Sequence, residues 1–278
     1  MRLRTLPVSI AGVITAIAYN VMTGTFNAIP AFLCLLFALL AQIASNFANE
    51  YYEFRDGLDK VGRDGPRRGV TEGDISPRAM KIATFAVLAV AGIVGCSLIY
   101  WGGWWLLPIG LLIALGVVAY STGPYPLSRH CLGEVAVIIF FGIVPVNLTY
   151  YVQALQFSTP VLLGSIAIGL MGANVIIVNN YRDADDDAEV GKHTLANVYG
   201  RKTASMLYFF DGIVAAILMY AQNLHFLWGI ILYLIIHLIL WQFLRGHKGA
   251  ALNPLLGMTA MLMLLFSIFL LVHALVMG

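Results

Sequence analysis

Long apolar runs, each followed by a short polar stretch, make up most of this chain. A bilayer core about 30 Å thick requires about 20 apolar residues in helical form, and a helix satisfies its backbone polar groups within one segment. Glycine, proline and polar residues occupy the joins. The pattern therefore predicts nine membrane-spanning helices, near residues 6–24, 30–54, 78–99, 104–121, 133–153, 159–180, 203–221, 225–244 and 253–276.

Composition supports a membrane protein and excludes one class of partner. The chain is 60% hydrophobic and 11% charged, whereas soluble domains carry about 25% charged residues. We expect an all-α, polytopic membrane protein with about nine helices in a bundle around a central cavity, folded as a single domain over residues 1–278. The net charge of +2 indicates no basic stripe, so nucleic acid is excluded as a partner.

The distribution of basic residues predicts the orientation of the bundle. All 16 Lys and Arg residues lie before the first helix or in and beside the second, fourth, sixth and eighth connections. Because Lys and Arg favour the cytoplasmic side of a membrane, we expect the N-terminus and every long loop in the cytoplasm. The expected location is the cell (cytoplasmic) membrane.

The densest cluster of acids follows the sixth apolar run. The stretch "NNYRDADDDAEVGKHTLA" begins at residue 179 and holds five acids within seven positions. On one continuous helix, at about 100° per residue, five polar side chains would fall within an arc of roughly 120°, while Asp185 points elsewhere. These five are Asn179, Asn180, Asp183, Asp186 and Asp187.

A second acidic cluster closes the second apolar run, in "NFANEYYEFRDGLD" at 46–59. In both clusters an Asn is followed four residues later by an acid, which suggests an internal duplication into residues 1–125 and 126–250 with a further C-terminal helix. Four crossings separate the copies, so both are expected on one side of the membrane. The residues that share one helical face here are Asn46, Asn49, Glu50, Glu53 and Asp56.

Carboxylates at this density repel one another unless a positive charge lies among them. A hard divalent cation answers that need, because Mg²⁺ takes oxygen ligands and is typically held by carboxylates together with substrate phosphates. Two facing clusters could hold two or more ions with a diphosphate between them. For each cluster alone, a solvated helix end is the alternative.

At these motifs the sequence resembles the UbiA-type intramembrane aromatic prenyltransferases, whose signatures are Asn-Asp-x-x-Asp after the second helix and Asp-x-x-x-Asp after the sixth. It is similar in particular to the 1,4-dihydroxy-2-naphthoate branch of the menaquinone pathway, in "RLRTLP", "GPRRGVTEGDISPRAMK", "YSTGPYPLSRHCLGE", "FFGIVPV", "TYYVQ" and "LNPLL". One departure is that Glu50 and Glu53 stand where the family usually has Asp. Glutamate reaches one methylene further, which changes the geometry available to a metal.

The resemblance implies a Mg²⁺-dependent reaction between a polyprenyl diphosphate and an aromatic acid at the lipid bilayer. Mg²⁺ would neutralise the diphosphate and help it leave, and the allylic cation would then meet the electron-rich ring. In this branch the ring carbon that is attacked carries a carboxylate, which departs as CO₂ to leave demethylmenaquinone. The active site is expected to face the cytoplasm.

Residue roles follow from the motifs and the resemblance. The planar guanidinium group of arginine can donate two hydrogen bonds to phosphate oxygens. Any single Lys or Arg could instead only anchor the helices at the cytoplasmic side of the membrane. The expected metal ligands are Asn49, Glu50, Glu53, Asp56, Asn180, Asp183 and Asp187, with Asn46 as a further candidate. Asp183, Asp187, Tyr120 and Ser121 are the expected catalytic residues, Arg4, Arg63, Arg67, Arg68 and Lys192 the diphosphate-binding residues, and Arg129 and His130 the acceptor-binding residues.

Other polar features carry weaker expectations. The segment from Pro66 to Lys81 is interpreted as a cap over the site, with Ser76 as the N-cap of the third helix. Glu134 is expected near the membrane interface. Asp211 is a buried acid in an apolar helix and hence a functional candidate or one half of a polar pair, and His237 is expected to be a hydrogen-bonded packing residue.

Two further interpretations remain open from the sequence alone. The acceptor could be another aromatic acid, of the 4-hydroxybenzoate or homogentisate type. A membrane transporter with a cytoplasmic cation site is the alternative from another class, although transporters with inverted repeats place related elements on opposite sides of the membrane.

Overall fold

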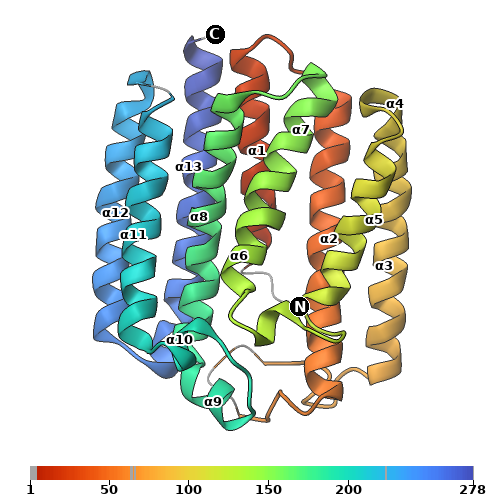
Figure 1. Ribbon diagram of the computed structural model, residues 1–278, viewed down its shortest axis with the longest axis vertical. Helices are drawn as coiled ribbons and strands as arrows, with labels where there is room; N and C mark the ends of the chain where they lie inside the picture. The colour runs from red at the N-terminus through yellow and green to blue at the C-terminus, as the bar shows by residue number, and fades with distance from the viewer. Residues whose placement is uncertain (1–4, 63–64, 66, 223, 278) are drawn as a thin grey trace.

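The computed structural model describes residues 5–62, 65, 67–222 and 224–277, and these fold almost entirely as helices (Figure 1). The helices are α1 (Leu6–Met22), α2 (Ala28–Arg55), α3 (Pro77–Ser97), α4 (Ile99–Gly102), α5 (Leu106–Ala119), α6 (Gly133–Val137), the π-helix η3 (Ile138–Ile143), α7 (Val144–Ala154), α8 (Thr159–Arg182), α9 (Ala184–Glu189), α10 (Leu195–Val198), α11 (Arg201–Tyr220), α12 (Leu227–Gly246) and α13 (Asn253–Met277). Short 3₁₀ turns lie at Leu127–Arg129, Leu224–Phe226 and Gly249–Leu252.

The predicted all-α membrane class is confirmed. Within the described residues, seven helical spans are long and apolar enough to cross a bilayer, and α1 and α5 are shorter apolar helices. Each of the nine predicted segments coincides with one of these helical rods. The count of nine crossings and the orientation of the bundle stay predictions.

Local sequence signals explain where several helices begin. Ser76 precedes α3, and its hydroxyl accepts a hydrogen bond from the backbone N–H of Ala79 at 3.2 Å, as the sequence predicts. Pro77 follows at the first helical position, where its missing N–H costs nothing. The side chain of Asn27 caps α2 in the same way, by accepting from the N–H of Ile29 at 3.1 Å.

The helices at the centre of the bundle approach one another through glycine. A Cβ on Gly12 of α1 would lie 2.7 Å from the carbonyl oxygen of Phe141, and one on Gly169 of α8 would lie 2.8 Å from that of Ile138. Both carbonyls belong to the π-helix, which ends just before Pro145. Because proline has no N–H and its ring crowds the preceding turn, a wider turn fits there.

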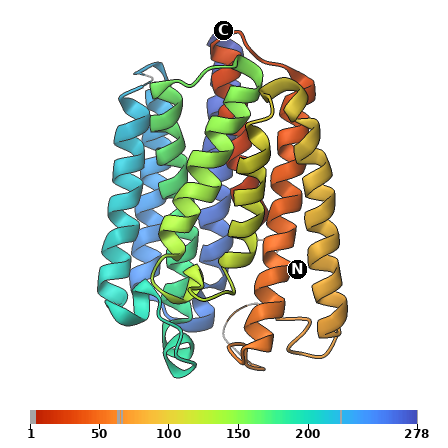
Figure 2. The same cartoon turned by 45° about the vertical axis from the view of Figure 1, so that its right-hand side comes forward.

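The bundle has two unequal cores. The larger core joins α1, α8, α11, α12 and α13, and the smaller one gathers around Val13, Cys34, Leu98, Leu106 and Val152. Figures 1 and 2 show α9, α10 and the loop after α2 at one end of the bundle and α4 at the other. The polar ends of α2 and α8 therefore lie on the same side.

Candidate active site

The first acidic cluster is buried at the end of α2. Asn49, Glu50 and Glu53 are each no more than 5% exposed, and the loop before α3 folds over them. Arg68 from this loop forms an ion pair with Glu53 and donates to Asn49 Oδ1 at 3.3 and 3.4 Å. The backbone N–H of Val70 donates to Glu50 Oε1 at 3.1 Å. The loop thus covers the cluster and neutralises part of its charge.

The second cluster does not continue α8, so the prediction of one helix through residue 187 is wrong. The backbone turns at Asp183 (φ −90°, ψ 8°), and the short helix α9 begins at the next residue. Asp183 is held by Arg182, whose Nε and Nη2 lie 2.6 and 2.7 Å from its two carboxylate oxygens. Asp187 is buried on α9, and this burial raises the pKa of its carboxyl above the ordinary value.

The two clusters meet at one amine. Lys192 Nζ lies 3.4 Å from Glu53 Oε1 and 3.3 Å from Asp187 Oδ1. The structure therefore brings together an acid from α2 and an acid from α9, which the sequence places 134 positions apart. The geometry is that of two acidic clusters that face each other, with a cation between them.

Backbone hydrogen bonds between two loops hold this junction in place. His130 and His193 form an isolated parallel β-bridge, in which Cys131 N donates to His193 O at 3.1 Å and His193 N to Arg129 O at 3.3 Å. The loop after α5 is thereby joined to the loop that carries Lys192.

Tyr120 and Ser121 lie beside the first cluster. Asn49 Nδ2 donates to Ser121 Oγ at 3.2 Å, and Ser121 is fully buried. Tyr120 lines the cavity described below together with Asn46 and Asn49. Two of the four residues that were expected to be catalytic are thus close to the ligand candidates of α2.

Several predicted site residues lie away from the junction. Asp56 is paired with Arg55 and with Arg129, whose Nη2 lies 2.6 Å from Asp56 Oδ2, and the hydrogen bond from Arg55 holds the pKa of Asp56 low. Arg67 is exposed and forms a 3.1 Å ion pair with Asp74. His130 stacks on Tyr125 with ring centroids 3.7 Å apart. Asp186 is partly exposed, and Arg4 and Arg63 lie outside the described residues.

Sequence reasoning missed three partners of the second motif. Arg182 Nη2 donates to Asn179 Oδ1 at 2.9 Å and Arg182 Nη1 to Asn253 Oδ1 at 3.0 Å, which ties α8 to α13. Glu134, expected near the membrane interface, is buried at the start of α6 and accepts from Asn180 Nδ2 at 2.9 Å. An arginine directly before an acid at the end of an apolar run was the signal in the sequence for the Arg182 network, and no spacing rule indicates the pair of Glu134 with Asn180.

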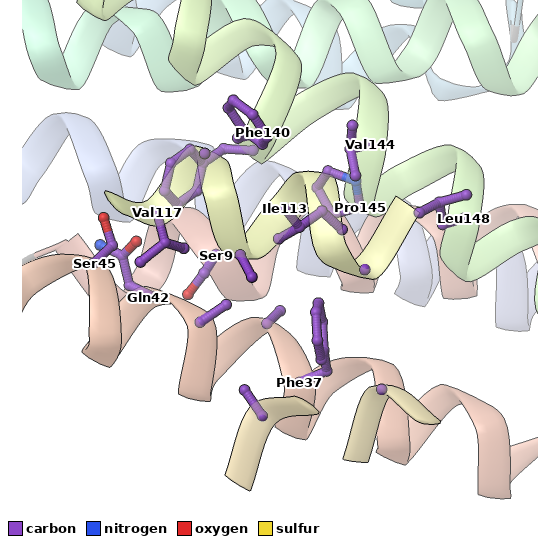
Figure 3. A pocket seen from close by; sticks show the side chains of 18 of the residues that line it. Ser9, Phe37, Gln42, Ser45, Ile113, Val117, Phe140, Val144, Pro145 and Leu148 are labelled. Atoms are coloured by element: carbon purple, nitrogen blue, oxygen red, sulfur yellow. The ribbon is translucent and has the colours of Figure 1, made fainter. Parts of the chain in front are cut away.

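An apolar cavity of about 320 Å³ extends from the first cluster into the bundle (Figure 3). Its α2 wall extends from Asn49 to Cys34, about 22 Å at 1.5 Å per residue. Gln42 and Ser45 lie toward one end and Leu148 toward the other, and Phe37 and Phe140 come from opposite walls. Exposed residues also line the cavity where α3 faces α5, so it opens to the lipid-facing surface: Gly92, Cys96, Leu107 and Leu111.

The donor atoms at the junction fit a hard divalent cation. In the described part of the chain, no three His, Cys, Asp or Glu side chains form a ready-made metal site, and the ammonium group of Lys192 lies between Glu53 and Asp187. Asp187 Oδ2 is nevertheless buried and accepts no hydrogen bond from any described residue. Carboxylate and amide oxygens are the ligands that Mg²⁺ takes in proteins.

Comparisons with known proteins agree with this architecture. A 1,4-dihydroxy-2-naphthoate octaprenyltransferase from Escherichia coli is 32% identical over 93% of this chain and 88% of that protein. The enzyme of the same name from Haemophilus influenzae is 33% identical over 70% of this chain and 66% of its own length, just under two thirds.

Among solved structures, a UbiA homolog from Archaeoglobus fulgidus bound to DMAPP and Mg²⁺ has a TM-score of 0.67 to this chain, at 16% identity, over 97% of this chain and 98% of that one. At this identity the likeness shows the fold alone. The sequence profile of the UbiA prenyltransferase family matches residues 6–268. With this match over nearly the whole chain and with relatives above 30% identity, the protein belongs to the UbiA prenyltransferase family and is a membrane-embedded prenyltransferase.

Proposed function

We propose that this protein transfers a polyprenyl group from a polyprenyl diphosphate to 1,4-dihydroxy-2-naphthoate, in the cell membrane and with its reacting end toward the cytoplasm. The observation that carries the proposal is the junction at Lys192, where acids of both motifs meet beside an apolar cavity. Charged groups at one end and an apolar channel behind them suit a substrate with a diphosphate head and a hydrocarbon tail. The naphthoate acceptor is the one named for the relatives in Escherichia coli and Haemophilus influenzae.

In this proposal, the diphosphate lies between the two clusters and is held by Lys192 and Arg68. Both side chains are buried and already paired with Glu53. The Arg68 guanidinium offers a planar fork that matches phosphate oxygens. Arg67 is directed to solvent and is not part of the proposed site.

Mg²⁺, when bound, would neutralise charge on the diphosphate and favour its departure. The residues that would hold it are Glu53 and Asp187, with the amide oxygens of Asn49 and Asn180. Ser121 fixes the Asn49 amide by accepting from its Nδ2, which leaves Oδ1 on the side of Arg68 and Glu53. Asp183 is assigned to the same site through its position one turn before Asp187, and its carboxylate is held by Arg182.

The proposed reaction breaks the allylic C–O bond of the donor and forms a C–C bond to the ring. The diphosphate leaves with the bonding electron pair, and the ring carbon that carries the carboxylate supplies the pair for the new bond. CO₂ then departs and returns its bonding pair to the ring, so no net proton is removed and the product is the quinol form of demethylmenaquinone. Tyr120, beside Asn49, would present its aromatic face to the allylic cation.

The hydrocarbon tail would occupy the apolar cavity. A volume of about 320 Å³ is at the lower end of the roughly 300–1,000 Å³ typical of small-molecule pockets. A tail of many isoprene units therefore extends beyond it, and the opening between α3 and α5 gives such a tail a path into the lipid.

Transfer by the purified protein in liposomes tests this proposal. Labelled octaprenyl diphosphate, 1,4-dihydroxy-2-naphthoate and Mg²⁺ should yield a labelled lipid quinol, and EDTA should stop its formation. Asp187→Asn should reduce turnover by more than about 100-fold. Loss of a residue that only supports a metal ligand typically reduces activity by about 10- to 100-fold, so a direct ligand should have a larger effect. The matched control is Asp185→Asn, because Asp185 is exposed and pairs with Arg201 outside the junction. Equal activity of the two variants would contradict the proposed site.

A panel of acceptors tests the branch. The protein should prenylate 1,4-dihydroxy-2-naphthoate in preference to 4-hydroxybenzoate and homogentisate, and release of CO₂ should equal the formation of product. Preference for either of the other acids would place the enzyme in another branch while leaving the prenyl transfer itself established.

A further inference from the structure

Glu134 lies outside both motifs but contacts one of them. It occupies the first turn of α6 and is 5% exposed. Its Oε1 accepts the hydrogen bond from Asn180 Nδ2, and its Oε2 is buried with no hydrogen-bond partner among the described residues. Burying a carboxylate is costly unless it is paired and hydrogen-bonded, so the unpartnered Oε2 calls for an explanation.

The start of α6 is also close to the reacting end of the cavity. A Cβ on Gly133 would lie 3.6 Å from the Tyr120 hydroxyl oxygen and 3.5 Å from Ile176 of α8. The helix that carries Glu134 therefore packs against α8 beside the Tyr120 side chain. The contact between Glu134 and Asn180 thus joins the start of α6 to the last turn of α8, directly before Asp183 of the second motif.

The pairing with Glu134 determines how the Asn180 amide is turned. An amide side chain has a donor end and an acceptor end, which can exchange by a rotation of about 180°. In the structure, Glu134 Oε1 accepts from the NH₂ end of Asn180 at 2.9 Å. The carbonyl oxygen Oδ1 then points away from Glu134, and it is the only atom of this side chain that could bind a cation.

We infer that Glu134 is a positioning residue that orients Asn180 so that its carbonyl oxygen faces the cation site. The inference rests on the proposed function, because it assumes that Asn180 is a ligand of the metal that accompanies the diphosphate. Outer partners that orient a metal ligand typically contribute about 10- to 100-fold to metal affinity. The rival account is structural: the pair would only attach α6 to α8.

Pairwise substitution separates the two accounts, with Mn²⁺ as the probe. Binding of Mn²⁺ to the full-length protein in nanodiscs would be followed by electron paramagnetic resonance, and the melting temperature would be measured on the same samples. Glu134→Leu removes the acceptor without adding a donor, and we expect Mn²⁺ affinity to fall about 10- to 100-fold. Ser165→Ala is the matched control, because it removes the 2.9 Å partner of another buried amide, Asn147, that packs against α8.

The most decisive test restores a donor–acceptor pair between positions 134 and 180. Asn180→Asp places two carboxylates against each other and should weaken Mn²⁺ binding. Adding Glu134→Gln in that background lets the glutamine NH₂ donate to Asp at 180, which leaves the second oxygen for the ion, so affinity should recover. Glu134→Gln alone should have a small effect, because glutamine also offers an acceptor.

Two outcomes would overturn the inference. The first is a Glu134→Leu variant that melts at a lower temperature but binds Mn²⁺ as the wild type does, and the second is a double variant that binds no better than Asn180→Asp. Asp187→Asn serves as a separate arm. If it leaves Mn²⁺ binding unchanged, the proposed metal site itself is wrong, whatever Glu134 does.

Discussion

Replacing Gly92 with leucine should make the enzyme select against long donors. Gly92 lies on α3, where the cavity opens toward lipid, and a Cβ at this position meets no atom within 4 Å. The Cβ of leucine would therefore displace no neighbour, and three further carbon atoms would extend from it at the opening. Because leucine is also a better helix former than glycine, the substitution should not weaken α3.

The size of the effect follows from the geometry of the opening. A misfit of one methylene in an apolar pocket is worth about 1–3 kcal/mol, or about 10- to 200-fold in kcat/KM. A tail that must pass Gly92 meets a whole side chain, so kcat/KM for octaprenyl diphosphate should fall by at least about 10-fold. Geranyl diphosphate, with two isoprene units, ends inside the cavity and should react at nearly the wild-type rate.

Two glycines supply the controls. Gly246 at the end of α12 also has open space at its Cβ but does not line the cavity, so Gly246→Leu should leave the ratio of the two donors unchanged. A Cβ on Gly95 would lie 3.0 Å from the Phe37 ring, and Gly95→Leu should destabilise the fold by about 1–3 kcal/mol. Product formation from both donors would be measured by mass spectrometry in liposomes. If Gly92→Leu lowered kcat/KM equally for both donors, or for neither, the proposed path of the tail between α3 and α5 would be refuted.

Two other substitutions test the charges of the junction. Glu53→Gln should raise the Mg²⁺ concentration for half-maximal activity by about 10-fold or more. Glu189→Gln should not change it, because Glu189 forms an exposed pair with Lys60. If both variants required the same Mg²⁺ concentration, Glu53 would not belong to the metal site. Arg68→Met should lower stability by about 3–5 kcal/mol, because it breaks a buried ion pair. Arg67→Met should change stability by less than about 1 kcal/mol at its exposed pairs, as thermal melts in detergent would show.

The positions of the helices follow from the sequence because lipid leaves the backbone few alternatives. An apolar run near 104–121 corresponds to α5 at Leu106–Ala119, and the run near 203–221 corresponds to α11 at Arg201–Tyr220. The π-helix before Pro145 was not expected, since a widened turn leaves no change in the hydrophobic pattern. The internal duplication stays a prediction.

The sequence contains a signal that α8 ends at Asp183, but the helical spacing of the polar residues around it suggests one continuous helix. Acids at 185, 186 and 187 occupy the first turn of α9, where negative charge favours the positive end of the helix dipole. Such a run signals a new helix start rather than the continuation of α8. On one continuous helix Asp186 and Asp187 would face the site together, whereas on α9 Asp187 is buried and Asp186 is partly exposed.

The partners of the motifs are harder to predict, because they come from distant parts of the chain. Arg68 was expected to bind diphosphate, yet its contacts to Asn49 and Glu53 depend on how the loop before α3 folds back. Asn253 follows Arg182 by 71 positions and Glu134 precedes Asn180 by 46. Local patterns fix which face of a helix is polar, while tertiary packing decides which polar groups meet.

The buried charges at the junction also make the binding of the cation and the binding of the diphosphate depend on each other. Glu53 is paired with Arg68 and Lys192, and Lys192 is shared with Asp187, so the cluster is partly neutralised before any substrate binds. A divalent cation that entered alone would separate the Lys192 ammonium group from Glu53 and Asp187, and breaking buried ion pairs is costly. A diphosphate that entered alone would add negative charge beside Glu53 and Asp187. When both are present, the cation takes Glu53 and Asp187 and the diphosphate takes Lys192 and Arg68, so these four charges again have partners. We therefore expect each of the two to bind more tightly in the presence of the other, by the same factor in both directions.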